Sequence, residues 1–256
     1  MGNLLEKIWI EKYIETLPLW KQTAYQSFSS TITNAKKPFP CIPAIQGFLA
    51  DQLRFSFIED PRQLHSSQEL AEVLRAYGKC SRDTGKYASL VVFFETPKDV
   101  SENYHIENYR ELFWTVLNNV TTFDEKEWPE DIPTDPSHHK WEFCFDGEPY
   151  FVFCATPAHL VRKSRHSPCL LMAFQPRWVF EKINDSTVFG RNMKKLIRQR
   201  LVDYDGVPGH PDLKWYGNEN NHEWKQYFLS EDESSPSKCP FMKMKNKFSN
   251  FLNKKI

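Results

Sequence analysis

The sequence predicts a single α+β domain in which helices flank a mostly antiparallel sheet. Three observations favour this class. The segment from Tyr87 to Glu95 is largely apolar and rich in β-forming residues, as is typical of a buried central strand. Residues 141–153 form two strand-like runs around an Asp146-Gly147 step, which is a hairpin signal. Elsewhere, apolar residues recur at intervals of three and four, which is the helical period.

The first half of the chain is expected to alternate between helices and less regular segments. Four prolines interrupt residues 34–62, so this stretch is predicted to be irregular. Ser66 or Ser67 is expected to cap the helix that follows it. The expected elements are, in order, a helix within 4–17, the irregular segment 34–62, a helix from Ser66 or Ser67 to Gly78 or Gly85, the strand 87–95 and a helix over 102–120.

The second half is expected to complete the sheet and to add one long helix. Pro149 indicates an edge or a bulge in the second strand of the hairpin. Ser186 or Thr187 is expected to cap the last core helix, whose apolar stripe runs between lysines and arginines. The expected elements are a polar loop over 124–138, the hairpin 141–153, a strand over 169–174, a short helix from Pro176 to Ile183 and the helix that ends near Leu201.

The domain is predicted to span residues 1–229, followed by two segments of different composition. Residues 230–237 are acidic and rich in serine and proline, so they are predicted to form a linker. Residues 238–256 contain six lysines and no acidic residue. As a helix, this tail would carry an apolar stripe beside a cationic face. It is therefore expected either to contact an anionic membrane surface weakly or to pack back on the core.

Composition excludes several classes of protein. Lys+Arg and Asp+Glu both number 33, and this zero net charge argues against a nucleic-acid binder. No apolar run is long enough for a membrane helix, and no signal peptide is recognisable, so we expect a cytoplasmic protein. The six cysteines form no CxxC pair, which disfavours a structural zinc site or a redox dithiol.

The densest group of chemically active residues follows the hairpin. His159 lies close to Arg162, Lys163 and Arg165, and a neutral imidazole can ligate a transition metal. The neighbouring guanidinium groups could hold carboxylates of a cofactor or substrate through paired hydrogen bonds. The alternative is that these cations are only solvated and that His159 makes an N-terminal or loop contact. Arg177 has the same two interpretations, since it could bind an anion or pack beside Trp178.

Two proline-flanked cysteines are alternative ligands. Cys41 follows Pro40 and Cys239 precedes Pro240, and a thiolate in either place could reach haem iron. A free buried thiol is the commoner outcome. Adjacent His138 and His139 precede a strand, and in a strand their rings would point to opposite faces, which disfavours a shared metal.

Taken together, several stretches resemble the YqcI/YcgG family of bacterial proteins. They cover most of the chain between residues 20 and 241. The stretches are FPC at 39–41, WEFCFDGEPYFVF at 141–153, TPAHLVRKSR at 156–165, AFQPRWVFE at 173–181, RQRLVDYDGVPGHPDL at 198–213, NHEWKQYFL at 221–229 and CPF at 239–241. A related branch contains haem-dependent enzymes that N-hydroxylate guanidino groups. That branch has a His-Pro step where this chain has Thr156-Pro157, followed by His159.

The resemblance implies a haem-binding protein and a monooxygenase acting on a small guanidino or amino metabolite. In this hypothesis His159 ligates iron, while Arg162, Arg165 and Arg177 hold the haem propionates. Carboxylates would pair with a guanidinium substrate, and the candidates are Glu142, Glu148 and Glu223. The aromatic residues expected beside the porphyrin are Trp141, Phe143, Phe151 and Phe153. The alternative function is a haem-binding or interaction protein without catalysis.

Overall fold

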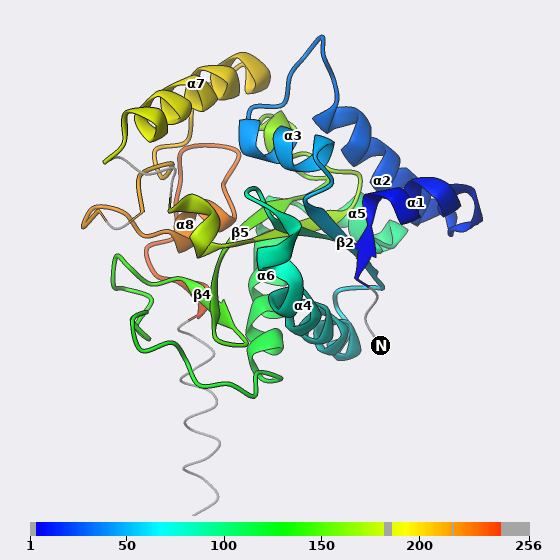
Figure 1. Cartoon of the computed structure of the whole chain (residues 1–256), viewed down its shortest axis with the longest axis horizontal. Coiled ribbons are helices and arrows are strands. Elements are labelled where there is room, and N and C mark those ends of the chain that lie inside the picture. The colour runs from blue at the N-terminus through cyan, green and yellow to red at the C-terminus, as the bar shows by residue number, and fades with distance from the viewer. Residues whose placement is uncertain (1–3, 182–185, 217, 242–256) are drawn as a thin grey trace, which may run out of the picture.

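A computed structural model describes residues 4–181, 186–216 and 218–241 and has one six-stranded sheet (Figure 1). The strand order is β1-β2-β3-β6-β5-β4, with β2 and β3 parallel and every other neighbouring pair antiparallel. The predicted α+β class with a mostly antiparallel sheet is confirmed. The strands are β1 (Leu5–Glu6), β2 (Leu53–Ile58), β3 (Ser89–Phe94), β4 (Phe143–Phe145), β5 (Glu148–Ala155) and β6 (Leu170–Pro176).

The central strand β3 shows how the sheet separates two cores. All six of its residues are buried, as predicted for the segment 87–95. Leu90 and Val92 face one core, whereas Val91 and Phe93 face the other, because successive side chains in a strand point to opposite sides. Both faces of the sheet must therefore be covered.

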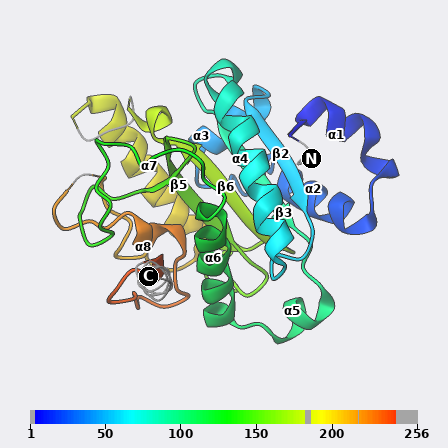
Figure 2. The ribbon, with the colours of Figure 1, turned by 90° about the horizontal axis from the view of Figure 1, so that it is seen from below.

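Helices from different parts of the chain cover the two faces (Figures 1 and 2). The first face carries α4 (Leu64–Thr84), α6 (Ile106–Thr121) and α8 (Trp224–Tyr227). The opposite face carries α1 (Lys7–Tyr13), α2 (Leu19–Ile32), α3 (Ile42–Leu49) and α7 (Val188–Asp205). Shorter elements complete the chain: α5 (Lys98–Asn103) and the 3₁₀ helices η1 (Ile14–Thr16), η2 (Lys163–Arg165) and η3 (Arg177–Phe180). None of the helices described is both long enough and apolar enough to cross a membrane.

The prediction that residues 34–62 are irregular is wrong. This stretch contains α3 and β2, and Pro43 lies in the first turn of α3, where proline costs no internal hydrogen bond. The helix predicted over 102–120 is also divided. Its first residues belong to the end of α5. A second helix, α6, begins at Ile106, because His105 and Asn108 form a reciprocal N-terminal cap there.

The hairpin prediction is confirmed. β4 and β5 pair antiparallel, with Phe145 opposite Glu148. Asp146 and Gly147 have φ values of 53° and 78°, as a two-residue type I′ turn requires. Thr187 also caps α7 as predicted, since its hydroxyl accepts a hydrogen bond from the Gly190 amide at 2.9 Å.

The segment predicted as a linker is packed against the domain. The Glu231 carboxylate accepts hydrogen bonds from the backbone amides of Leu160, Val161 and Arg162. Farther along, Phe241 is 4 % exposed and lies against Trp141, with ring centroids 5.3 Å apart. The remainder of the predicted tail, residues 242–256, lies outside the described residues.

Candidate functional site

A deep cavity of about 370 Å³ lies between the sheet and α7. Alternate residues of β5, namely Phe151, Phe153 and Ala155, form part of its floor. α7 and the segment 213–216 cover it from the other side. A concave, mostly apolar space with a few charged groups is the usual form of a small-molecule site.

Cys41 lines this cavity and is the N-cap residue of α3. Burial raises the pKa of its thiol, while the Ala44 amide and the Arg165 guanidinium act in the opposite direction. The net direction is a raised pKa, so the free thiol keeps its proton and would have to release it to ligate a metal ion. Cys239 lies in the opposite core beside Phe241, away from the cavity.

A buried charge cluster lies at another part of the cavity wall. Arg177 contacts Glu142 through one guanidinium nitrogen and lies 2.8 Å from Glu223 through the same nitrogen. The Tyr216 ring lies against the other side of this cation, 3.7 Å from the guanidinium carbon to the ring centroid. Glu223 is 5 % exposed, and its Oε2 accepts no hydrogen bond from the described residues. Burial raises the pKa of Glu223, and the Arg177 charge opposes that rise.

His159 is completely buried, and both of its ring nitrogens are engaged. Nδ1 lies 2.9 Å from the Thr156 hydroxyl and Nε2 lies 3.0 Å from the Leu229 carbonyl oxygen. The imidazole therefore joins the loop after β5 to the segment after α8. Burial lowers the pKa of His159 to about 3, so the ring is neutral at physiological pH. His159 is not among the residues that line the cavity.

Arg162 and Arg165 border the cavity, but their guanidinium groups donate hydrogen bonds mainly to backbone carbonyls. Arg162 donates to Ser230, Pro208 and Asp232, and thereby ties three segments together. Arg165 donates hydrogen bonds from its guanidinium to the carbonyl oxygens of Cys154, Gln226 and Tyr227. Arg165 also lies over the Phe153 ring at 4.1 Å. Burial without a carboxylate partner lowers the pKa of Arg165 to about 10.

The remaining predicted site residues divide between the cavity and other regions. Phe151 and Phe153 line the cavity, whereas Trp141 and Phe143 belong to the core on the other face of the sheet. Glu148 is also outside the cavity lining and pairs with Arg82 at 3.4 Å. A ligand in the cavity could therefore contact Phe151 and Phe153, whereas Trp141 and Phe143 lie on the other face of the sheet.

Several cavity residues were not predicted to be site residues. Their side chains come from the long helix and from the irregular segment after it, so no local motif connects them. They are Lys194, Arg198, Lys214, Trp215 and Tyr216. With the three arginines already described, they make cations more numerous than the two lining carboxylates, Asp205 and Glu223. The cavity is therefore suited to a ligand with anionic groups.

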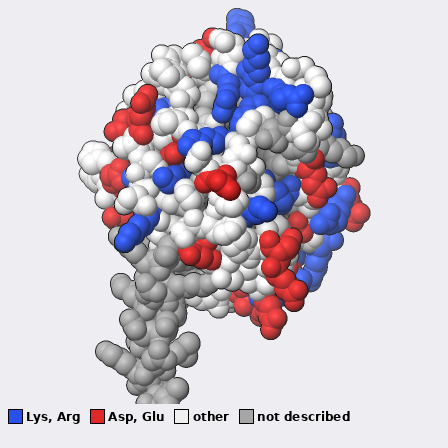
Figure 3. Space-filling model, turned by 90° about the vertical axis from the view of Figure 1, so that its left-hand side faces the viewer, with Lys and Arg blue, Asp and Glu red and all other residues white. Residues whose placement is uncertain are grey.

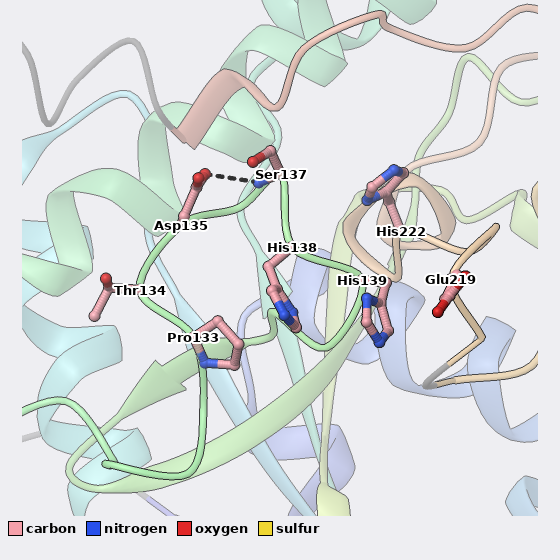
Figure 4. Close-up of a pocket in the computed structure, with 8 residues that line it drawn as sticks. All are labelled: Pro133, Thr134, Asp135, Ser137, His138, His139, Glu219 and His222. Atoms are coloured by element: carbon pink, nitrogen blue, oxygen red, sulfur yellow. Dashed lines mark hydrogen bonds between the residues drawn. The ribbon is translucent and has the colours of Figure 1, made fainter.

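A second, open hollow contains three histidines (Figure 4). His138 and His139 lie in a turn rather than a strand, and their rings stack with centroids 4.5 Å apart. His222 reaches the hollow from the segment before α8. Within the described ranges, no group of three or more His, Cys, Asp or Glu residues is arranged to hold a metal ion. We assign no metal to this hollow.

Comparison with known proteins gives consistent results over nearly the whole chain. The sequence profile of the YqcI/YcgG family matches residues 28–242. The "Uncharacterized protein YcgG" of Bacillus subtilis (strain 168) is 56% identical over 248 residues, which cover 97% of this chain and 98% of the relative. The "Uncharacterized protein YqcI" of the same organism is 54% identical with the same coverage.

A more distant relative carries a functional name. The "Putative N(omega)-hydroxy-L-arginine synthase DcsA" of Streptomyces lavendulae is 30% identical over 246 residues, which cover 94% of this chain and 91% of the relative. No solved structure matches the chain.

Proposed function

Since the chain belongs to the YqcI/YcgG family, we propose that it is a haem-dependent monooxygenase that N-hydroxylates a small compound bearing a guanidino or amino group. The name of the Streptomyces lavendulae relative supports this reaction class. The observation that carries the proposal is one cavity bordered by a thiol and by a carboxylate with an unused oxygen. The thiol belongs to Cys41 and the carboxylate to Glu223.

The kinds of residue around the cavity support a haem site. Cys41 would be the iron ligand in preference to His159, whose two nitrogens are already hydrogen bonded inside the chain. Lys194, Arg198 and Lys214 would pair with the propionates, although Arg198 and Lys214 each also donate one hydrogen bond to a backbone carbonyl, of Leu213 and Asn220 respectively. Phe151 and Phe153 would contact the porphyrin. When bound, the haem would supply the activation of dioxygen.

The protein's contribution would be to orient the substrate and to exclude water. A guanidinium group can donate two parallel hydrogen bonds to one carboxylate. Here Arg177 already holds the Glu223 Oε1, so the substrate would donate to the unused Oε2 only. The Tyr216 ring stacks on Arg177 and so helps to fix this pair. Such prior positioning lowers the entropy cost of bringing substrate and oxidant together.

The test is the absorption spectrum of the protein after expression with a haem precursor. We expect a Soret band, with a position in the reduced carbon monoxide complex that indicates thiolate ligation. Cys41→Ser should lose the haem or shift this band, whereas the control Cys80→Ser on α4 should leave it unchanged. Absence of haem in the wild type would contradict the proposal. Bound haem without hydroxylation of L-arginine or another guanidino compound would favour the non-catalytic alternative.

A further inference from the structure

The outer side of α7 is unusually exposed for a helix that borders a cavity. Of its 18 residues, only Gly190 and Asp205 are buried. The expected core helix is therefore only partly buried: Phe189 and Leu196 of its apolar stripe are exposed, whereas Met193, Ile197 and Leu201 are half-buried. Apolar side chains exposed along α7 are Val188 (65 %), Phe189 (49 %), Leu196 (46 %) and Val202 (39 %). Exposed apolar side chains that gather in one place are characteristic of interaction surfaces.

The same helix is strongly cationic. α7 contains five cations, Arg191, Lys194, Lys195, Arg198 and Arg200, and two acidic residues in its last turn, Asp203 and the buried Asp205. Four of the cations line a surface groove of about 390 Å³ together with Gln199, Val202 and Trp215. Figure 3 shows lysine and arginine side chains gathered in the upper part of this side of the molecule, where α7 lies. We call α7 and this groove the α7 surface.

The α7 surface lies directly outside the proposed active site. Lys194, Arg198 and Trp215 line both the groove and the large cavity. Lys194 bridges the two regions through its contact with Trp215, 3.7 Å from its Nζ to the ring centroid. A macromolecule bound on the α7 surface would therefore be separated from the cavity by a single layer of side chains.

We propose that the α7 surface docks an acidic redox protein that delivers electrons to the cavity. This inference rests on the proposed function. N-hydroxylation of a substrate R–NH₂ consumes O₂, two electrons and two protons, and yields R–NHOH and water. The nitrogen compound receives one oxygen atom, and the other is reduced to water by the two electrons. The electron donor is therefore an obligatory partner, and a flavodoxin-type or ferredoxin-type protein has the required chemistry.

Charge and apolarity together favour a protein over a nucleic acid. The chain has zero net charge, so the positive character of α7 is local. Cations around apolar side chains are typical of a protein interface, where charge directs the encounter and apolar contacts retain the partner. Binding to an acidic protein should weaken as salt increases, because the exposed charges are screened.

The experiment measures binding of a purified acidic flavodoxin to the full chain by titration calorimetry at low and moderate salt. The variant Arg191→Glu/Lys195→Glu reverses two charges of the α7 surface. The matched control, Lys79→Glu/Lys98→Glu, reverses two exposed charges on α4 and α5. We expect the Kd to rise at least tenfold in the first variant and less than twofold in the control. Circular dichroism and the haem spectrum check that both variants remain folded.

Absence of flavodoxin binding, or equal weakening in both variants, would overturn the proposal. Tighter binding of a single-stranded DNA oligonucleotide than of flavodoxin would also overturn it. Turnover driven by a chemical reductant tests the proposed function separately, because that reductant needs no docking surface. Retained turnover with the reductant and lost turnover with flavodoxin in the α7 variant would support docking. If flavodoxin binding weakens equally in both variants while turnover with the chemical reductant is retained, docking is rejected and the proposed function is not.

Discussion

At the scale of single residues, the proposed substrate recognition depends on Glu223. A carboxylate this deeply buried is costly unless its oxygens are compensated, and Arg177 compensates only one of them. A cationic group of the substrate would compensate the other. We expect Glu223→Gln to lower kcat/KM for a guanidino substrate roughly 10- to 100-fold, the usual value of a charged hydrogen bond.

The matched control for this prediction is Glu148→Gln. Glu148 is outside the cavity lining and pairs with Arg82, so its substitution should change kcat/KM by less than about twofold. Steady-state kinetics on both variants provide the measurement. Equal effects of the two substitutions would remove Glu223 from substrate recognition.

His159 makes stability depend on pH. Its pKa is lowered from 6.5 to about 3 by burial, so the unfolded state binds a proton that the folded state rejects. Stability from this group is complete above pH 6.5 and is lost as pH falls toward 3, by about 1.4 kcal/mol per pH unit. We expect His159→Gln to reduce that slope, since an amide can serve the same two partners without titrating.

Urea denaturation of the wild type and of His159→Gln between pH 7 and 4.5 measures this difference. The exposed His65→Gln variant is the control, because its ring lies at the surface. If the His159 and His65 variants show the same pH slope as the wild type, His159 does not titrate in this way.

The limits of sequence reasoning at this scale are visible in His159 and Cys41. Both were candidate ligands by residue type, but only packing decides which one faces the cavity. Thr156 in the same loop engages Nδ1 of His159 and the Leu229 carbonyl engages Nε2, and the second contact joins residues 70 positions apart. Glu223 could be named from its chemistry alone, whereas its partnership with Arg177 depends on tertiary structure.

At the scale of elements, local signals succeeded where backbone geometry is determined by neighbouring residues. The Asp146-Gly147 turn and the Thr187 cap are of this kind. β2 is not predicted, because the prolines on either side of it indicate an irregular segment. Its alternation, Leu53, Phe55 and Phe57, was nevertheless a strand signal. Its parallel pairing with β3 is a non-local feature that no local signal specifies.

The hairpin turn requires a residue that tolerates positive φ. Gly147 has φ of 78°, a region that β-branched residues tolerate poorly. We expect Gly147→Val to lower the free energy of unfolding by about 1–3 kcal/mol. Gly147→Asn should cost less, because asparagine adopts positive φ more readily. Thermal unfolding of both variants measures the difference, and equal melting temperatures would contradict this account of the turn.

At the scale of the whole molecule, the two faces of the sheet have different tasks. The face covered by α4 and α6 holds a dense aromatic core, whereas the face toward α7 contains the cavity. The segment after α8 belongs to both. Its first residues bind the loop after β5, and its last described residues enter the aromatic core. The C-terminal region therefore closes the fold and supports the site at the same time.

Two truncations test this closing role. A chain ending at Ser237 loses Cys239 and Phe241, which are 2 % and 4 % exposed. Removal of a buried aromatic side chain typically costs about 3–5 kcal/mol, so this variant should melt at a clearly lower temperature. A chain ending at Phe241 retains both residues and should melt close to the full-length protein. Equal melting of the two truncated chains would show that the aromatic contact with Trp141 contributes little.

The chain ending at Phe241 also tests whether the lysine-rich end contacts membranes. Residues 242–256 contain five of the lysines of the predicted tail, and each cation near an anionic surface contributes about 1 kcal/mol. We expect the full chain to co-sediment weakly with vesicles containing phosphatidylserine, and the chain ending at Phe241 to lose that binding. Salt should abolish it, because surface charges are screened within about 10 Å at 0.1 M. Truncation at Ser237 is unsuitable for this comparison, since exposed core residues would bind lipid nonspecifically. Equal sedimentation of the full chain and the chain ending at Phe241 would exclude membrane contact through these lysines.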